Sequence, residues 1–443
     1  MYLASYFSRR ENICYVRDTD TGWNAVDYEP VYYRYDKQGT HRTLTGFPVT
    51  PCYSYEKGEK GIFEKDIDPT LRVLSSLYLN ENDAPTSHRI VFLDIETRIG
   101  GALTKDYIES APMEITAIAL YDKQTDIRYV LILDEDGQVN QIDTLGKKII
   151  PFRTERDLLK YFLRLWESID LTIVVTYNGE WFDMPYLYYR LKRMLSEKDA
   201  CRLSPLGIVE KGYYLRPGEK LQKQPTRLVK IAGISSLDYL LLYKKFVPKK
   251  QTSYRLGYIG EKEVGMGKIA FKGNLNDLFK QDIDKFIAYN LNDVDILVKL
   301  DEKLQFIALT LMIAHNAHTV YENIYYSSLI LDGAIYVALK RKGIVAPNKP
   351  VTDNPALRRE FLNDDGAEEE IKKFTGAFVK EPQTGRFDWL TDEDLASLYP
   401  SIIRSMNIGI ETMVCRVVGK GDDLGVVLGG FFDKLAGLVH RSL

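Results

Sequence analysis

The sequence has little cysteine and no long apolar segment, and both absences narrow the class of protein. Only four of its 443 residues are cysteines (Cys14, Cys52, Cys201 and Cys415), and they lie far apart without a CxxC pair. This spacing argues against a disulfide framework or a zinc ribbon and predicts reduced thiols in the core. No apolar run is long enough to span a bilayer, and residues 1–10 lack the charged-then-apolar pattern of a signal peptide. We therefore expect a cytosolic protein with no membrane partner.

The chain also lacks the excess of basic residues that marks many nucleic-acid-binding proteins. Its net charge is −3 and its pI is near 6.1. Local basic runs do occur at Arg190–Arg193 and Lys244–Lys250, although charge alone favours an ordinary solvated face for each. The composition, 45% hydrophobic and 27% charged, is that of a globular protein, and the length predicts two to four domains.

Alternating strands and helices predict an α/β domain from about residue 87 to 305. The predicted strands are Ile90–Leu93, Ile115–Tyr121, Ile127–Leu133 and Leu171–Tyr177, and the predicted helices are residues 155–168, 183–195 and 286–314. Before this region, residues 1–86 are rich in tyrosine and short strand-like segments. Within it, residues 208–231 interrupt the alternation and have the pattern of a hairpin around a turn at 216–219. Residues 306–348 form a further helical piece. The tripeptides Asn348-Lys349-Pro350 and Asp353-Asn354-Pro355 mark a boundary at its end.

Three short motifs place acidic residues in this α/β domain. Asp94 and Glu96 end the first apolar strand and, being two residues apart, project from the same face. Asp183 begins a helix after the segment Tyr177–Phe182. The alternative role of Asp183 is that of a helix N-cap. Tyr289 and Asp293 are one turn apart on a predicted helix, where the alternative is a pair on a wet face. The first motif is common when it stands alone, whereas the complete string around Asp183 is much rarer than a helix cap.

Taken together, the motifs provide four carboxylates and a tyrosine, which suit cleavage of a phosphodiester by two metal ions. Carboxylate oxygens are ligands for hard divalent cations, and two such cations can stabilise the attacking and the leaving oxygen. Tyr289 could orient the attacking water. Aromatic residues near these motifs could stack on the bases of single-stranded DNA, or could equally pack in the core. The DNA-binding candidates are Tyr177, Asn178, Trp181, Phe182 and Tyr254.

These motifs resemble the exonuclease motifs I, II and III of family B DNA polymerases. Two further segments, Ser236–Phe246 with Ser253–Leu256 and Gly376–Pro382, look like the T-even phage branch of that family. The resemblance implies an α/β (α+β multidomain) chain with an RNase H-like 3′→5′ proofreading exonuclease of the DEDDy type. It also implies two Mg²⁺ ions, for which Mn²⁺ can substitute, held by Asp94, Glu96, Asp183 and Asp293.

By the same resemblance, residues 1–86 and 306–348 form an N-terminal domain into which the exonuclease, residues 87–305, is inserted. The hairpin at 208–231 corresponds to the one that helps to part primer from template. A phage-infected bacterial cell is the expected location.

The segment from Asp394 to Ile403 resembles motif A of the polymerase palm, so residues 349–443 are predicted to be a partial palm. The resemblance implies that Asp394 and the Leu395 carbonyl bind metal. It also implies that Ser397 and Leu398 face the triphosphate of a dNTP and that Tyr399 packs under its sugar.

A second metal-binding aspartate in a palm hairpin and the lysine-rich fingers helix are not found in the sequence. The isolated GDD at 421–423 carries little weight. With one aspartate the two-metal polymerase site cannot form.

Four interpretations remain open. The leading one is a split polymerase, in which a second chain supplies fingers, remaining palm, thumb and any segment that binds a sliding clamp. The apolar stretch from Val414 to Leu443 fits a large obligate interface with that chain; the alternative is that it packs on the palm of its own chain. A truncated single-chain polymerase suits the sequence nearly as well. A non-catalytic nucleic-acid-binding regulator is disfavoured by the complete set of acids, and a free-standing exonuclease by the presence of motif A.

Overall fold

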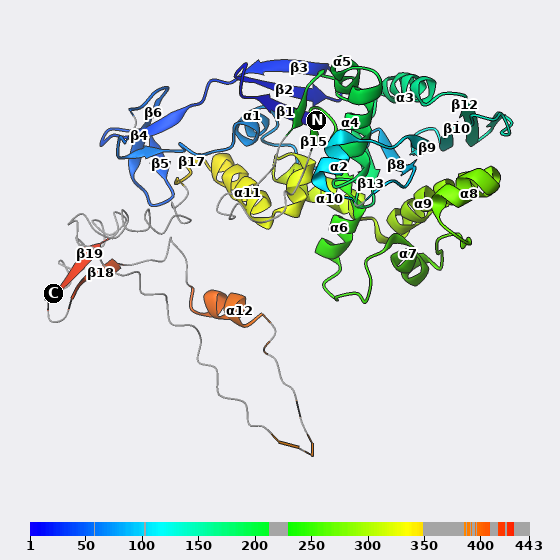
Figure 1. The fold of residues 1–443 in the computed structure, drawn as a ribbon. Helices are drawn as coiled ribbons and strands as arrows, with labels where there is room; N and C mark the ends of the chain where they lie inside the picture. The colour runs from blue at the N-terminus through cyan, green and yellow to red at the C-terminus, as the bar shows by residue number, and fades with distance from the viewer. Residues whose placement is uncertain are drawn as a thin grey trace. The chain divides into compact units, whose positions relative to one another are not determined.

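The computed structural model describes residues 1–56, 58–101, 103–211, 229–348, 385–386, 388–389, 391, 395, 397–407, 415–420 and 423–428. The chain divides into two units, and the helices and strands of each are labelled in Figure 1. The first comprises Met1–Pro30 and Ile67–Arg341, and the second comprises Val31–Asp66 and Lys342–Leu443. Among the described residues, no helix has both the length and the apolar character that a bilayer crossing requires.

A seven-stranded sheet forms the centre of the first unit, in the order β11-β12-β10-β9-β8-β13-β16. Neighbouring strands β8, β9 and β10 are antiparallel, whereas β13 is parallel to both β8 and β16. The carboxyl ends of the parallel strands β8, β13 and β16 therefore lie on the same side of the sheet. The first two predicted acidic motifs lie at these strand ends. The strands are β8 (Ile90–Thr97), β9 (Ile115–Asp122), β10 (Ile127–Leu133), β11 (Ile142–Thr144), β12 (Lys147–Phe152), β13 (Ile173–Thr176) and β16 (Ser235–Asp238).

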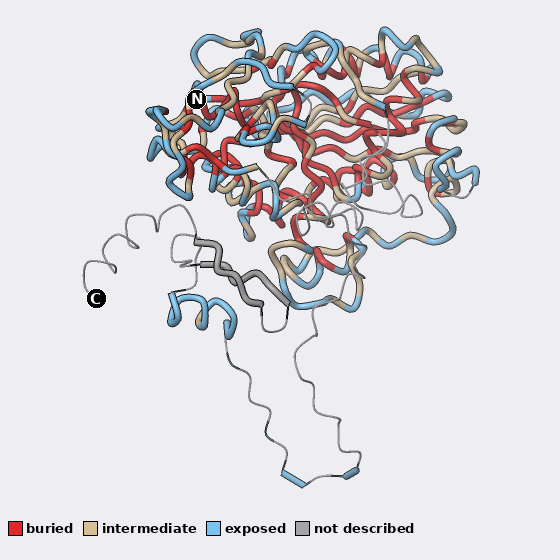
Figure 2. Tube along the Cα trace, turned by 90° about the vertical axis from the view of Figure 1, so that its left-hand side faces the viewer, coloured by how far each residue is buried: buried red, intermediate tan, exposed pale blue. Residues whose placement is uncertain are grey.

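Both faces of this sheet are covered, so its central strands are apolar on both sides. Along β8, Val91, Leu93 and Ile95 belong to one hydrophobic cluster with the helices α3 and α4. Ile90 and Phe92 belong to a second cluster with α6, α7 and α9, as the alternation of side chains along a strand requires. Figure 2 shows the buried residues concentrated in the interior, with exposed residues around them. The helices are α2 (Lys105–Ser110), α3 (Glu155–Ile169), α4 (Asp183–Met194), α5 (Glu197–Cys201), α6 (Tyr239–Phe246), α7 (Leu256–Val264), α8 (Leu275–Gln281) and α9 (Ile283–Leu304).

The first unit also joins the start of the chain to residues beyond α9. The Tyr2 hydroxyl donates to the Thr319 carbonyl at 3.0 Å, and the Tyr2 ring stacks on His315 with centroids 4.4 Å apart. This contact is of the kind expected for an inserted exonuclease, although the predicted domain boundaries themselves stay a prediction. The elements concerned are β1 (Tyr2–Ser8), β2 (Ile13–Asp18), β3 (Gly22–Asp27), α1 (Pro69–Leu77), α10 (Phe306–Asn316), the 3₁₀ helix η1 (Tyr321–Tyr325) and α11 (Ser327–Arg341).

The base of the predicted hairpin is present in the first unit. Strands β14 (Val209–Lys211) and β15 (Val229–Ile231) pair antiparallel, with Lys211 opposite Val229. The rest of the predicted hairpin, residues 212–228, lies outside the described residues.

The second unit contains a five-stranded sheet in the order β17-β5-β6-β4-β7. It brings residues 41–43 and 344–345 together, because β17 pairs parallel with β5. Beyond it, no residue of α12 is buried, and Figure 2 draws this helix as exposed. The elements are β4 (Tyr32–Tyr35), β5 (His41–Thr43), β6 (Pro48–Cys52), β7 (Ile62–Phe63), β17 (Ile344–Val345), α12 (Leu398–Ser405), β18 (Cys415–Lys420) and β19 (Asp423–Leu428).

Candidate active site

Three of the four predicted carboxylates meet at the carboxyl end of β8. Asp94 and Glu96 project from the strand, Asp293 projects from α9, and one oxygen of each lies within 4.8 Å of the others. Asp94 and Glu96 are half-buried and Asp293 is buried, so the alternative of fully solvated acids at a strand end is wrong.

Asp183 reaches the same strand from the start of α4. Its Oδ1 accepts a hydrogen bond from the Ile95 backbone N–H at 3.1 Å, between Asp94 and Glu96. The N-cap of α4 is Phe182 rather than Asp183, so the helix-cap alternative is wrong. The aspartate is instead used to reach the backbone of β8, which places the fourth carboxylate next to the other three.

The pair on α9 is buried, contrary to the alternative of a wet face. Tyr289 is 6% exposed and Asp293 is 2% exposed. The predicted apolar face of α9 was too narrow, because the segment after α7 covers the flank that carries these two residues, with the Phe271 ring against Tyr289 at 5.5 Å. From that segment Lys268 places its Nζ 2.9 Å from the Tyr289 hydroxyl and forms an ion pair with Asp293.

Lys268 and Asn290 are site residues that sequence reasoning missed. The Asn290 Nδ2 donates to Asp94 Oδ2 at 2.8 Å, and its side chain is fully buried. A polar residue facing the core side of an amphipathic helix was the available indication for Asn290. Lys268 stands in an irregular segment, where no period in the sequence indicates its direction.

Burial and repulsion between neighbouring carboxylates raise the pKa values of the acidic residues in this cluster. Burial, followed by repulsion from Glu96, Asp183 and Asp293, raises the pKa of Asp94 well above its ordinary value. Burial, followed by repulsion from Asp293, raises the pKa of Glu96 to about 8. Burial raises the pKa of Asp183 to about 7, although the Ile95 N–H acts in the opposite direction. The cluster thus favours the binding of positive charge.

The donor set fits divalent cations that prefer oxygen ligands. All of its negatively charged groups are carboxylates, which provide oxygen ligands. Lys268 offsets only part of their charge. Among the described residues, Asp293 Oδ1 is buried without a hydrogen-bond partner. A buried anionic oxygen without a partner is costly, and a bound cation would satisfy it.

The aromatic candidates for DNA contact lie around this cluster and are only partly packed in the core. Tyr177 and Tyr254 are joined by a hydrogen bond from the Tyr177 hydroxyl to the Tyr254 carbonyl at 2.6 Å. Phe182 packs on Tyr186 with ring centroids 5.2 Å apart. Tyr177, Trp181, Phe182 and Tyr254 are each partly exposed, whereas Asn178 is exposed. Tyr177, Phe182 and Tyr254 also pack against the core, so their contact with DNA stays a prediction.

The two basic runs have different surroundings. Arg190 is buried and forms a salt bridge with Glu155 at 2.6 Å, so this residue holds α4 to α3 rather than forming part of a solvated or DNA-binding face. In the second run, Lys244 lies over the Tyr254 ring at 5.0 Å and Lys245 donates to Ser327 Oγ at 3.1 Å.

The predicted polymerase motif is only partly within the described residues. Asp394, the predicted metal ligand, lies outside them. Leu395 and Tyr399 are 71% and 72% exposed, and Ser397 has a left-handed backbone conformation (φ 54°) before α12. The structure therefore brings none of the described motif A residues into a closed site.

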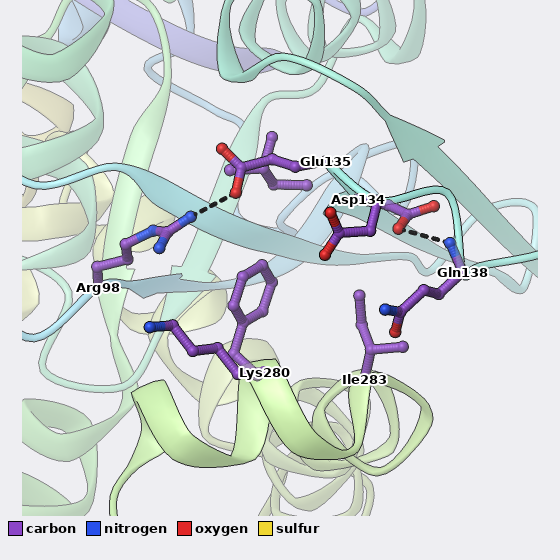
Figure 3. Close-up of a pocket in the computed structure, with 9 residues that line it drawn as sticks. Arg98, Asp134, Glu135, Gln138, Lys280 and Ile283 are labelled. Atoms are coloured by element: carbon purple, nitrogen blue, oxygen red, sulfur yellow. Dashed lines mark hydrogen bonds and ion pairs between the residues drawn. The ribbon is translucent and has the colours of Figure 1, made fainter.

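A separate pocket of about 280 Å³ begins at Arg98, two residues beyond Glu96. In Figure 3, Arg98 pairs with Glu135 across its mouth, and Lys280 and Ile283 line the helical side. The buried Asp134 accepts from the N–H groups of Gly137 and Gln138 and so shapes its own loop. None of the predicted metal-site residues lines this pocket.

Comparison with known proteins gives matches to one family in two segments. Residues 49–259 match the exonuclease domain of DNA polymerase family B, and residues 323–424 match DNA polymerase family B itself. The chain is 34% identical over 288 residues to the DNA-directed DNA polymerase of Escherichia phage RB69, which covers 63% of this chain and 29% of the relative.

Two further relatives extend the comparison. The identity is 31% over 325 residues to the DNA-directed DNA polymerase of Enterobacteria phage T4, covering 68% of this chain and 34% of that protein. It is 27% over 346 residues to DNA polymerase 1 of Sulfurisphaera ohwakuensis, covering 75% and 36%. The chain thus spans about a third of the length of these relatives. Both segments match the same family, and Asp94, Glu96 and Asp183 lie within the exonuclease match. The chain therefore belongs to the family B DNA polymerases and carries their exonuclease domain and the start of their polymerase domain.

Proposed function

We propose that this chain is a 3′→5′ proofreading exonuclease for DNA replication and one part of a DNA polymerase of the T-even phage type. The observation that carries the proposal is the meeting of Asp94, Glu96 and Asp293 within 4.8 Å, with Asp183 bound to the strand between the first two. The sheet order around β8 supports the RNase H-like fold predicted for the exonuclease.

The four carboxylates would hold two Mg²⁺ ions, or Mn²⁺ in their place. Bound there, the cations would supply a hydroxide nucleophile and stabilise charge on the attacking and leaving oxygens. Asp183 is held by the Ile95 N–H and Asp94 by the Asn290 amide, so the ligands are oriented before a cation binds.

Tyr289 and Lys268 would act beside the carboxylates. Burial raises the pKa of Tyr289 to about 12, so its hydroxyl stays protonated and can donate a hydrogen bond to water or to a phosphate oxygen. Lys268 stays protonated as well: burial acts to lower its pKa, but the adjacent Asp293 carboxylate raises the pKa above its ordinary value. The ammonium group of Lys268 can therefore fix the Tyr289 hydroxyl and place a positive charge at the site.

The DNA would enter as a single strand with its 3′ end at the carboxylates. Tyr177, Trp181, Phe182 and Tyr254 would stack on the bases, and the side chain of Asn178 would contact the strand. The hairpin that starts at β14 and β15 would help to part primer from template.

The polymerase part would need a second chain. Asp394 and the Leu395 carbonyl would bind metal there, and Ser397, Leu398 and Tyr399 would contact the dNTP. In the part of the chain that the structure describes, Leu398, Tyr399, Ile402 and Ile403 of α12 and Met406 after it are exposed, which suits a surface that a partner would cover. A truncated single-chain polymerase remains the alternative, because it would present the same exposed side chains. A sliding clamp would be bound through the partner.

Digestion of a 5′-labelled primer, free and annealed to a template, tests the proposal. With Mg²⁺ and dNTPs, the purified chain should shorten the primer stepwise from its 3′ end and should not extend it. EDTA should stop the shortening. Release of internal fragments, or no digestion with Mg²⁺ or Mn²⁺, would contradict the proposed function.

A further inference from the structure

A buried aspartate outside the predicted site lies directly behind the loop proposed to receive DNA. Asp238 is the last residue of β16, and it pairs in register with Thr176, the last residue of the neighbouring parallel strand β13. The loop Tyr177–Phe182 follows Thr176 without a gap. The Asp238 side chain is fully buried, so its carboxylate acts on protein groups and not on solvent.

The contacts of Asp238 join this loop to a helix. Its Oδ1 accepts from the Asn178 backbone N–H at 2.9 Å and from the Leu240 backbone N–H at 3.0 Å. The second bond caps the N-terminus of α6, and the first holds the loop. Among the described residues, the other oxygen, Oδ2, is buried without a hydrogen-bond partner. Burial raises the pKa of Asp238, against the lowering effect of these N–H groups.

The loop needs such an anchor, because its first turn is unfavourable. Asn178 has a left-handed backbone conformation with φ 64°, which costs free energy at a residue other than glycine unless the surroundings fix it. At Gly179, a Cβ would lie 2.3 Å from Thr176 Oγ1, so the chain passes very close to the end of β13. The Gly179 carbonyl then accepts from the Met184 N–H at 3.1 Å, which ties the loop to the first turn of α4.

Asp238 is itself held from behind by η1. Its backbone N–H donates to the Tyr325 hydroxyl at 2.6 Å. The Glu322 carboxylate accepts from the Ser236 N–H at 3.3 Å and from Ser235 Oγ at 3.2 Å. Tyr325 falls in the segment that matches the polymerase family, residues 323–424. Hydrogen bonds with η1 therefore fix the carboxyl end of β16, in addition to the bonds that Asp238 makes with the loop and with α6.

We propose that Asp238 is a positioning residue of the exonuclease, whose buried carboxylate holds the Tyr177–Phe182 loop in the shape that receives the 3′ end of a single DNA strand. The inference rests on the proposed function. It predicts that loss of the Asp238 oxygen weakens binding of the strand while leaving the metal-binding carboxylates able to react, since Asp183 keeps its bond to Ile95.

The test compares two substrates and three variants. A short oligothymidylate needs the loop, whereas the p-nitrophenyl ester of thymidine 5′-monophosphate presents a phosphodiester with no strand to stack. Asp238→Ala should raise KM for the oligonucleotide about tenfold, the loss expected when one base no longer stacks, and should change the rate on the ester by less than about twofold. Asp238→Asn keeps an oxygen acceptor in place and should restore KM to within about twofold of the wild type.

The matched control is Asp122→Ala. Asp122 is also a fully buried aspartate that ends a strand and accepts the N–H of the residue two further on, Gln124, at 3.0 Å. It pairs with Val91 at the opposite end of β8. This variant should lose stability without a change in KM. If Asp238→Ala does not fold, Asp238→Ser keeps a capping hydroxyl for α6, but its oxygen falls short of Asn178, and the same rise in KM is expected.

The outcomes separate this inference from the proposed function. A wild-type chain that cleaves neither substrate would contradict the proposed function. A wild-type chain that cleaves both, with KM unchanged in the Asp238→Ala or Asp238→Ser variant, would contradict only the role of Asp238. An equal rise in KM in Asp122→Ala, or an Asp238→Asn variant as impaired as Asp238→Ala, would also contradict it, because the first indicates a general loss of stability and the second a requirement for charge.

Discussion

At the residue scale, the site combines ligands that the sequence indicated with supporting groups that it did not. The spacing of Asp94 and Glu96 on a strand was sufficient to predict their common face, and the structure confirms that they meet Asp293. The roles of Lys268 and Asn290 depend on tertiary contacts. Lys268 lies in an irregular segment, and its direction follows from how that segment crosses α9, which no local pattern encodes.

Replacing Lys268 by methionine tests the contribution of its charge. The variant keeps the aliphatic bulk but loses the ammonium group beside Tyr289 and Asp293. We expect cleavage of single-stranded DNA to slow by about 10–100-fold, as is typical when a group that orients metal-binding residues is removed. Lys272→Met, at an exposed lysine four residues further on, is the control. A cleavage rate equal to that of the control under single-turnover conditions would remove Lys268 from the site.

At the scale of elements, the sequence predicted regular pieces well where one physical signal was strong. The strand Ile127–Leu133 and the helix beginning at Glu155 are confirmed, because a buried strand and an amphipathic helix each have a clear period. The predicted helix 286–314 is two helices, α9 and α10, which are separated by Gln305 in a left-handed conformation. An apolar pattern that continues across such a break does not reveal it.

The hairpin that starts at β14 and β15 provides a prediction at this scale. Replacing residues 212–228 by Asn-Gly should close the ladder at Lys211 and Val229 with a tight turn. Digestion of single-stranded DNA should stay within about twofold of the wild type, because the carboxylates are untouched. Digestion of a mismatched primer on a template should slow much more, if the removed segment helps to part the strands. Equal slowing on both substrates, in parallel assays, would contradict that role.

The histidines around η1 predict acid sensitivity. His88 and His315 are buried and lie 3.1 and 3.4 Å from the Tyr321 hydroxyl. Burial lowers the pKa of His88 to about 3 and the pKa of His315 to about 4. The unfolded chain therefore binds more protons than the folded one between these values and about pH 6.5. Their contribution to stability is complete above pH 6.5 and is lost as the pH falls.

Urea unfolding at pH 7 and pH 5.5 measures this effect. Each histidine should account for about 1.4 kcal/mol of lost stability per pH unit below about 6.5. His88→Gln, which keeps hydrogen-bonding atoms but cannot titrate in this range, should have a shallower dependence on pH than the wild type. The same slope in both proteins would mean that His88 is not neutral when folded.

At the scale of the whole molecule, the family assignment accounts for both segments of the chain, whereas the state of the polymerase site stays a prediction. The motif A resemblance lies in the segment that matches the polymerase family, but Asp394 is outside the described residues. Sequence could not decide between a split polymerase and a truncated one, because motif A without the second metal-binding aspartate is expected of both.

Reconstitution tests the split arrangement. Mixing this chain with a chain that carries fingers, remaining palm and thumb should produce Mg²⁺-dependent primer extension, since the second metal-binding aspartate would then be present. Asp394→Ala should abolish extension, by about a thousandfold or more if this residue binds both metals, and should leave 3′ digestion unchanged. Extension that survives Asp394→Ala would mean that motif A has been misidentified.

The central claim is that these carboxylates cleave DNA from its 3′ end. The most direct measurement is the rate at which the purified chain releases mononucleotides from a 3′-labelled single strand in Mg²⁺, compared between the wild type and Asp94→Ala. The wild type should release label at once, and Asp94→Ala should be inactive while keeping the circular dichroism spectrum of the wild type. Equal release by both proteins would show that the metal site has been placed at the wrong residues.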